Sequence, residues 1–180
     1  MKAKQKAVIL SQRELAPDIF DMWIETPLAE RAVPGQFIGV YTRDRSALLP
    51  RPISICQVSG DRTALRIVYR IAGKGTAEFS GYGAGEEIDI LGVLGNGFPL
   101  QEANGKKVFL MGGGIGVPPM LELAKQLNTD SQIILGYRDS RTFLKQEFEK
   151  HGRVYVATED GSVGVRGNVL DAVRENGLKA

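Results

Sequence analysis

The stretch LLPRPISIC at residues 48–56 places Arg51 between two prolines inside an apolar run. A guanidinium is a planar fork of donors that matches a phosphate group. Pro52 has no backbone donor and keeps the chain extended, which leaves one side of a strand open to a flat ligand. Arg51 and Ser54 face opposite ways in a regular strand, so a shared ligand requires a bend, backbone contacts or a molecule as large as a dinucleotide. Taken alone, an exposed arginine beside a turn explains the stretch better.

A second phosphate-binding pattern occurs in YRIAGKGTAEFSGY, residues 69–82. An alternating strand passes through Gly73 and Gly75 into a short helix that the sequence predicts to begin at Thr76. The first turn of a helix presents N–H groups without intrahelical partners, and these groups attract an anion. Arg70 is close by in the sequence and can serve as a counter-charge.

A third pattern, MGGGIGVPPM at residues 111–120, lies where a predicted strand gives way to a predicted helix. Its spacing is G-x-G-x-x-P, with Gly114, Gly116 and Pro119. Glycines permit a tight turn and a close approach of the backbone to a phosphate, and proline is tolerated in the first helical turn. A purely structural turn is the alternative. With the two arginines, the two glycine-led helix starts fit two dinucleotides better than any other common ligand.

Composition narrows the class of protein. The 180 residues carry 23 basic and 21 acidic side chains, a net charge of +2 that is too balanced to indicate nucleic-acid or membrane binding. The one cysteine, Cys56, excludes an internal disulfide and a four-thiolate metal site, and we expect it in the core. No apolar window is long enough to span a membrane. We therefore expect a reduced, cytoplasmic protein without membrane insertion.

The only histidine, His151, follows a predicted helix that ends in FEKHG. It is expected to be a neighbour of the helix C-terminus rather than a catalyst. The sequence therefore predicts no catalytic acid or base and no metal ligand.

The two halves of the chain have different periodicities. Residues 1–100 alternate apolar and polar side chains between turn residues, which predicts a six-stranded antiparallel barrel. Its expected strands are Ala7–Leu15, Ile19–Thr26, Gln36–Tyr41, Ile53–Val58, Leu65–Ile71 and Glu87–Leu91. Residues 101–180 alternate strand and helix, which predicts a parallel α/β domain. Three strands (in KKVFLM, SQIILGY and RVYVAT) and three helices (PPMLELAKQLN, RTFLKQEFEKHG and GNVLDAVRENG) leave this domain incomplete at its C-terminus.

These motifs resemble those of ferredoxin–NADP reductase-like flavoproteins, in which a flavin-binding barrel precedes a nicotinamide-binding α/β domain. RPIS resembles the Arg-x-x-Ser flavin signature of that family, and GGGIGVPPM resembles its nicotinamide turn. Nearly the whole chain also resembles one narrower family within this group. GQFIGV, LLPRPISI, LRIVYRIAGKGT, IDILGVLGNGF, MGGGIGVPPMLELAK, LGYRD and VATEDGSVGVRG follow in the order typical of electron transfer subunits of type B dihydroorotate dehydrogenases.

The resemblance implies FAD on residues 1–100 and NAD on residues 101–180. The expected FAD residues are Arg51, Pro52, Ile53, Ser54, Val68, Tyr69, Arg70, Gly75 and Thr76. The expected NAD residues are Gly113, Gly114, Gly116, Val117 and Arg138, with Tyr137 and Asp139 also near the adenosine ribose. Arg138 can meet a 2′-phosphate and Asp139 can repel one, so the choice between NAD and NADP stays open. EDGS at residues 159–162 is either a further contact or a plain turn.

The resemblance also implies an electron relay in pyrimidine biosynthesis. Electrons from dihydroorotate oxidation leave a catalytic FMN-containing partner subunit, within a heterotetramer, and cross a [2Fe–2S] cluster to FAD. The flavin then passes a hydride to NAD⁺ and supplies the redox chemistry itself. In that family the chain continues into a Cys-Gly-Pro motif and a cysteine-rich segment that holds the cluster. Because this sequence ends at Ala180, we expect a shortened form of a longer parent, with the cluster only in the parent.

Three alternatives stay open. A related reductase module of a hydrogenase, a sulfite reductase or a transhydrogenase shares the same flavin and nicotinamide motifs. A flavin-binding or partner-docking module without turnover would keep its flavin oxidised when NADH is added without oxygen. A barrel-plus-sheet protein without any cofactor is disfavoured by the two glycine-led helix starts.

Overall fold

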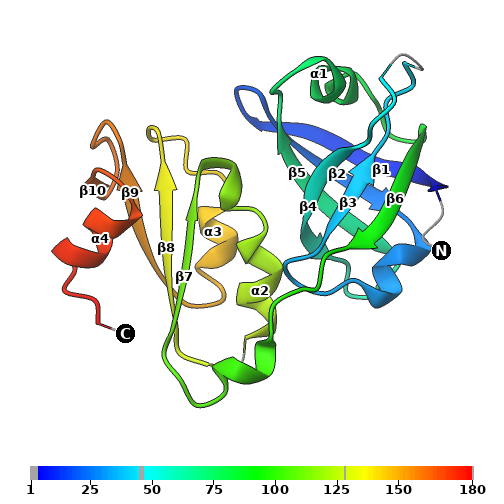
Figure 1. The fold of residues 1–180 in the computed structure, drawn as a ribbon. Coiled ribbons are helices and arrows are strands. Elements are labelled where there is room, and N and C mark those ends of the chain that lie inside the picture. Colours follow the sequence, from blue (N-terminus) through cyan, green and yellow to red (C-terminus); the bar gives the residue numbers. More distant parts are fainter. Residues whose placement is uncertain (1–3, 45–46, 128, 180) are drawn as a thin grey trace. The chain divides into compact units, whose positions relative to one another are not determined.

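The computed structural model describes residues 4–44, 47–127 and 129–179. The chain forms two compact units, which meet in the sequence between Gly97 and Phe98. Figure 1 shows a barrel in the first unit and a sheet with helices in the second. Within the described ranges, no helix has both the length and the apolar composition that crossing a membrane requires.

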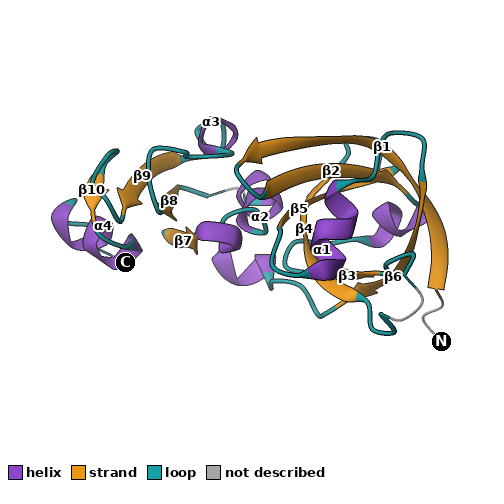
Figure 2. Ribbon diagram, turned by 90° about the horizontal axis from the view of Figure 1, so that it is seen from above, coloured by secondary structure: helices purple, strands orange, loops and turns teal. Residues whose placement is uncertain are grey.

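Six antiparallel strands close the first unit into a barrel, in the spatial order β1-β2-β5-β4-β3-β6 (Figure 2). This architecture confirms the predicted barrel and each of its predicted strands. The strands are β1 (Lys4–Ala16), β2 (Ile19–Glu25), β3 (Phe37–Val40), β4 (Arg51–Val58), β5 (Ala64–Arg70) and β6 (Glu87–Leu94), with the short helices η1 (Pro27–Arg31) and α1 (Lys74–Ser80) between them.

The core of the barrel follows from the alternation of side chains along the strands. Met22 and Ile24 of β2 are fully buried together with Ile67 of β5, and Phe20 packs against this cluster. The ring of Phe20 stacks on that of Tyr69, with centroids 5.8 Å apart. The inward side chains therefore fill the barrel and fix the strand ends that carry the predicted FAD residues.

The second unit is a parallel four-stranded sheet in the order β10-β9-β8-β7. Three of these strands were predicted, whereas β10 was missed because a strand of two residues is too short to leave a periodic pattern. The elements are η2 (Leu100–Ala103), β7 (Val108–Gly113), η3 (Gly114–Gly116), α2 (Met120–Gln126), β8 (Ser131–Tyr137), α3 (Lys145–Phe148), β9 (Arg153–Thr158), β10 (Val165–Arg166) and α4 (Val169–Glu175).

Helix α4 covers one face of this sheet. Ala172 of α4 is buried in a cluster with Ile134 of β8 and Ala157 of β9. Since side chains alternate between the faces of a strand, Ile133 and Leu135, which are also fully buried, belong to the opposite face. The sheet is therefore buried on both sides, as parallel sheets require.

The helix that was predicted over residues 141–152 is shorter than expected. Only Lys145–Phe148 is helical, because Leu144 has a left-handed backbone with φ 66° and the N–H of Thr142 bonds to the carbonyl of Ser140 at 2.9 Å. The residues before α3 therefore form turns. The N–H of His151 donates to the carbonyl of Phe148 at 2.8 Å, which confirms its place beside the helix C-terminus.

Asn168 caps α4, and its replacement by alanine should destabilise the second unit. Its Oδ1 accepts a hydrogen bond from the N–H of Leu170 at 2.8 Å, and its own N–H donates to Oδ2 of Asp171 at 2.8 Å. Loss of such a cap costs about 0.5–2 kcal/mol. The melting temperature of Asn168→Ala, measured by circular dichroism, should therefore be several degrees below that of the wild type. Glu175→Ala, at an exposed position in the last turn of the same helix, is the control. Equal melting temperatures for Asn168→Ala and Glu175→Ala would contradict the stabilising role of the Asn168 cap.

Candidate functional site

The barrel wall opens between β4 and β5. The ladder between these strands runs from Ile55 opposite Ile67 to Val58 opposite Leu65. In the described barrel, residues 51–54 pair with β3 alone and residues 68–70 pair with β2 alone. We call these two facing strand edges, residues 51–54 and 68–70, the open seam. Every predicted FAD residue of the two strands lies along it.

Residues on the two sides of β4 at the seam differ in exposure. Arg51 and Ile53 are half-buried, and Ile53 packs against the barrel core, whereas Pro52 and Ser54 are exposed. Strand β4 begins at Arg51 rather than at Ile53 as predicted, because proline is accepted where one edge of a strand has no partner. Arg51 and Ser54 therefore point to opposite faces, as the sequence indicated.

The side chain of Arg51 lies directly on the backbone of Gly75, at the start of α1. A methyl group on Gly75 would stand 2.3 Å from Nε and 2.9 Å from Cζ of Arg51. The guanidinium also donates from Nη1 to the carbonyl of Leu49. This contact brings two motifs that are separate in the sequence into one basic corner. Arg70 ends β5 and Lys74 begins α1, so both stand at the ends of the short connection that leads to Gly75. Lys74 was missed, although GKGT contains it.

Helix α1 begins at Lys74 and not at Thr76 as predicted. The hydroxyl of Thr76 accepts hydrogen bonds from the N–H groups of Ala72 at 2.8 Å and Gly73 at 3.2 Å, and it donates to the carbonyl of Gly73 at 3.1 Å. The side chain of Thr76 therefore holds the turn that starts the helix. Because the hydroxyl of Thr76 is used in this way, only the main-chain N–H of Thr76 is left to contact a ligand.

The side chain of Tyr69 lies in the core and not in the open seam. It is 1% exposed, its hydroxyl donates to Oε1 of Gln12 at 2.7 Å, and burial raises its pKa well above the usual range. Gln12 in turn donates to the carbonyl of Phe79 in α1 at 3.0 Å. Tyr69 therefore connects β5 to α1 and can meet a ligand only through its main chain. Val68 is also buried, and Arg70 is exposed.

An apolar hollow of about 600 Å³ lies beside Arg51 and is lined by residues 47–52. Leu48 and Leu49 within it are 81% and 77% exposed. Adjacent exposed apolar side chains form a patch of the kind that often marks a binding surface, and a flat aromatic ligand is one group that can cover it. The hollow thus adds an apolar wall to the basic corner.

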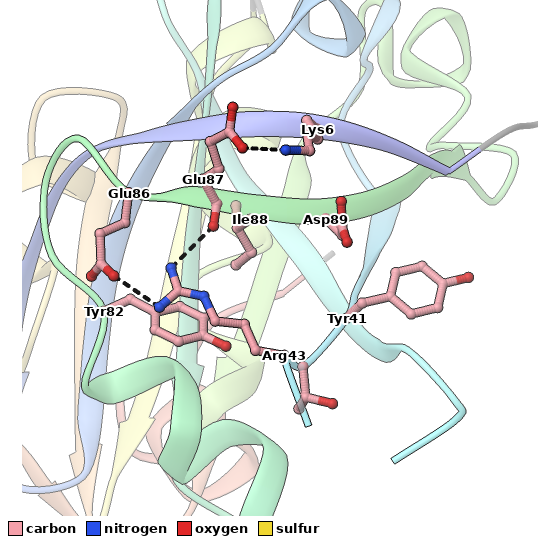
Figure 3. A pocket seen from close by; sticks show the side chains of 9 residues that line it. Lys6, Tyr41, Arg43, Tyr82, Glu86, Glu87, Ile88 and Asp89 are labelled. Atoms are coloured by element: carbon pink, nitrogen blue, oxygen red, sulfur yellow. Dashed lines mark hydrogen bonds and ion pairs between the residues drawn. The ribbon is translucent and has the colours of Figure 1, made fainter. Parts of the chain in front are cut away.

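A second hollow, of about 470 Å³, lies among β1, β6 and the loop after β3 (Figure 3). Arg43 donates to Oε1 of Glu86 at 2.8 Å and to the carbonyl of Glu87 at 3.2 Å. Its guanidinium lies 4.2 Å from the ring centroid of Tyr82, and its main-chain N–H donates to Oε1 of Glu78 at 2.6 Å. These contacts of Arg43 tie the loop after β3 to α1 and β6.

The glycine turn after β7 is tightly folded. A methyl group on Gly112 would lie 2.8 Å from the carbonyl oxygen of Gly116 and 2.9 Å from Cα of Val117, and Gly114 has a left-handed φ of 53°. Methyl groups on Gly113 or Gly116 would meet nothing within 4 Å, and the side chain of Val117 is fully buried. The turn therefore presents the backbone of its glycines to open space. Gly112 was missed as a site residue, although it is the first glycine of GGGIG.

The end of β8 lies beside this turn, since Gly113 pairs with Gly136. Tyr137 is buried, its hydroxyl donates to the carbonyl of Phe143 at 2.9 Å, and burial raises its pKa above the usual range. Arg138 is exposed, and its carbonyl accepts the N–H of Asp160 at 3.3 Å. The structure thus brings the turn, the end of β8 and the EDGS segment to one edge of the sheet.

Solved structures with this fold are ferredoxin reductase-like flavoproteins. An NADH-dependent reduced ferredoxin-NADP oxidoreductase, studied for flavin-based electron bifurcation, has a TM-score of 0.86 and 28% identity, covering 100% of this chain and 66% of that one. A ferredoxin NADP⁺ reductase from Neisseria gonorrhoeae with bound FAD and NADP has a TM-score of 0.76 and 19% identity, covering 96% of this chain and 76% of that one. Both confirm the predicted fold class.

No protein-family model matches the chain, but curated sequences do. The dihydroorotate dehydrogenase B (NAD(+)) electron transfer subunit of Streptococcus mutans is 40% identical over 96% of this chain and 69% of its own length. That of Enterococcus faecalis (strain V583) is 42% identical over 94% of this chain and 67% of its own. The chain thus spans about two thirds of the length of these relatives. By this identity and coverage, and in agreement with its motifs, the chain belongs to the family of dihydroorotate dehydrogenase B electron transfer subunits.

Proposed function

We propose that this chain holds FAD along the open seam, holds NAD at the glycine turn, and passes electrons between them as the electron transfer half of a dihydroorotate dehydrogenase B. The observation that carries the proposal is the guanidinium of Arg51 resting on Gly75. This contact joins a strand motif and a helix start into one cationic corner, and such a corner suits a pyrophosphate.

The residues at this corner fit the charged part of FAD, which when bound supplies the redox chemistry. Arg51 and the first-turn N–H groups of Gly75 and Thr76 would hold the pyrophosphate, because a guanidinium and unpaired amides both donate to phosphate oxygens. Arg70 and Lys74 would add positive charge. No side chain of the corner has to exchange a proton for this role.

The remaining seam residues fit the flat part of the same ligand. Pro52 and Ser54 are exposed on one face of β4, where they would lie along the isoalloxazine and ribityl groups. Ile53, Val68 and Tyr69 would contribute main-chain groups and apolar support, since their side chains are buried or half-buried. Ser54 would meet the reactive edge of the flavin through its hydroxyl.

The glycine turn fits a nicotinamide dinucleotide. The open space over Gly113 and Gly116 and the left-handed Gly114 allow a pyrophosphate to approach the backbone closely. Val117 would hold the turn from inside the unit. Arg138 would lie near the adenosine ribose at the end of β8.

The wider relay that we propose supplies electrons from dihydroorotate through a catalytic FMN-containing subunit and a [2Fe–2S] cluster, within a heterotetramer. The residues described here do not fit that cluster. Cys56 is fully buried, and residues 4–44, 47–127 and 129–179 contain no group of three His, Cys, Asp or Glu side chains arranged for a metal. No step at the residues of this chain is therefore assigned to the cluster.

Anaerobic addition of NADH to the FAD-loaded chain tests the proposal. If both sites are as proposed, the visible absorption of the oxidised flavin should bleach, and NAD⁺ should appear in equal amount. A folded chain that takes up no FAD would contradict the flavin site. A chain that binds FAD and keeps it oxidised under NADH would instead be a binding module without turnover.

Arg51→Ala should weaken FAD binding while the barrel stays folded. A hydrogen bond to a charged group contributes about 1.5–3 kcal/mol, so the Kd for FAD should rise roughly ten- to 150-fold. Titration of the apoprotein by flavin fluorescence quenching measures the change. Arg62→Ala removes an arginine from elsewhere in the barrel, where it donates to the carbonyls of Glu30 and Ala32, and should leave the Kd unchanged. Equal Kd values for Arg51→Ala and the wild type would contradict the assignment.

A related reductase module is the second candidate. The observation in its favour is the TM-score of 0.86 over 100% of the chain with the NADH-dependent reduced ferredoxin-NADP oxidoreductase. The two functions share both cofactors and differ in the electron donor. Reduction of the FAD by dihydroorotate in the presence of an FMN-containing dehydrogenase subunit supports the first, and reduction by ferredoxin alone supports the second.

A further inference from the structure

The side chain of Gln12, in the second half of β1, connects the end of α1 to a strand that borders the open seam. Its Nε2 donates to the carbonyls of Phe79 at 3.0 Å, Ser80 at 3.2 Å and Tyr82 at 2.7 Å. Its Oε1 accepts the hydroxyl of Tyr69 at 2.7 Å. Because carbonyls only accept and an amide nitrogen only donates, these partners fix the orientation of the amide.

We propose that Gln12 is a positioning residue for the FAD site, because it holds α1, on which Arg51 rests, in a fixed place beside β5. This inference rests on the proposed FAD site and adds to it a residue that is not part of the open seam.

Helix α1 depends on such contacts for its position. It has only seven residues, and helices of this length are not stable alone in water. The last carbonyls of a helix have no intrahelical partner, and Gln12 provides one at the end of α1. The ring of Phe79 also packs edge-on against that of Tyr69, with centroids 6.0 Å apart. The hydrogen bonds and the ring contact thus attach the end of α1 to β5.

The two ends of α1 are close enough to move together. A helix of seven residues is about 10 Å long. Gly75, which supports the guanidinium of Arg51, lies only four residues before Phe79. Tyr69, at the other end of the connection, belongs to the seam itself. Loss of the Gln12 hydrogen bonds would therefore disturb both the support of Arg51 and the seam edge of β5.

Gln12→Glu tests the proposal, because it keeps the size of the side chain and makes its hydrogen bonding depend on pH. A protonated carboxyl can still donate to a carbonyl, whereas an ionised carboxylate only accepts and faces the same carbonyls with like charge. Burial beside carbonyl oxygens disfavours the ionised form. The Kd for FAD should therefore lie within about threefold of the wild type at about pH 5 and should rise roughly tenfold or more towards about pH 8. Fluorescence titration of the full-chain apoprotein measures it.

The titratable side chains around residue 12 leave this pH profile readable. Burial raises the pKa of Tyr69 well above its usual range and is the main cause that raises the pKa of Tyr82 to about 12, so both stay neutral over this interval. Glu78 of α1, which accepts the hydroxyl of Tyr82, and the exposed Glu14 of β1 are also present in the wild type. The difference between the profiles of the variant and the wild type therefore belongs to residue 12.

Asn176→Asp is the matched control, because it also replaces an amide that donates to a helix carbonyl, that of Ala172 at 2.9 Å, but in the second unit. Its Kd for FAD should follow that of the wild type at every pH. A Gln12→Glu variant whose Kd also follows the wild type would overturn the role of Gln12 and leave the FAD site standing. If the wild type itself binds no FAD, the site is misplaced and the proposal falls with it.

Tyr69→Phe keeps the test decisive if Gln12→Glu does not fold, which circular dichroism at each pH establishes. It removes only the hydroxyl that Gln12 accepts, so the Kd for FAD should rise roughly two- to tenfold at every pH. A lower melting temperature with an unchanged Kd would make the amide a stabilising contact alone and would overturn the proposal.

Discussion

Gly75→Ala should give a folded barrel that binds FAD roughly ten- to 150-fold more weakly than the wild type. The new methyl group would lie 2.3 Å from Nε of Arg51, closer than atoms can approach, and it would occupy the place of the guanidinium. Because Arg51 is a flexible side chain at the edge of the barrel, it can swing away without disturbing the core. The expected loss of FAD-binding free energy equals that of Arg51→Ala, about 1.5–3 kcal/mol. Fluorescence titration of the apoprotein with FAD measures it.

Gly73→Ala is the matched control for this variant, two residues earlier, at the N-cap position of α1. A methyl group on Gly73 would meet nothing within 4 Å, and its backbone, with φ 175°, is extended and open to any residue. Its Kd for FAD should stay within about twofold of the wild type. The double variant Gly75→Ala with Arg51→Ala should bind FAD no worse than Arg51→Ala alone. Additive losses would mean that Gly75 acts on the ligand and not through Arg51.

Gly112→Ala should abolish most of the NADH-driven reduction of the flavin while FAD stays bound. The added methyl group would meet two backbone atoms, the carbonyl oxygen of Gly116 at 2.8 Å and Cα of Val117 at 2.9 Å, so the turn itself must shift. Such overpacking costs about 1–3 kcal/mol. If the same free energy is lost from NADH binding at the shifted turn, the rate constant of flavin reduction at low NADH should fall roughly five- to 150-fold. Anaerobic stopped-flow spectroscopy gives this rate constant.

Gly113→Ala separates a shifted turn from a blocked ligand. Its methyl group would meet no protein atom within 4 Å, so the melting temperature should equal that of the wild type. Its NADH response should still fall, because the open space over Gly113 is where the proposed ligand approaches. Wild-type reduction kinetics in both glycine variants would place the nicotinamide elsewhere.

The spacing of apolar residues along the sequence was sufficient to predict most of the elements of the fold. Strands β2 and β5 were predicted to within one residue at each end, because one face of each is buried in the barrel core. One end of β1, β4 and β6 extends two or three residues beyond the prediction. The failures were local. A left-handed Leu144 shortened α3, and the two residues of β10 were too few to show a pattern.

The candidate site was only partly predictable from the sequence. The glycines and Arg51 stood out because their types are unusual in strands and turns. That Arg51 would rest on Gly75, that the β4–β5 ladder would stop at Ile55, and that Tyr69 would turn inward depend on packing between distant segments. No local pattern encodes such contacts, so these features needed the structure.

The open seam has a consequence for the chain before any cofactor arrives. Two bare strand edges invite pairing with another molecule, which is a common route to aggregation. Pro52 removes a donor from the edge of β4, and Arg51 and Arg70 bring charge to the two edges; proline and charge are the means by which natural edge strands avoid such pairing. The same residues that suit a nucleotide would thus keep the newly made, empty barrel in solution until it is loaded.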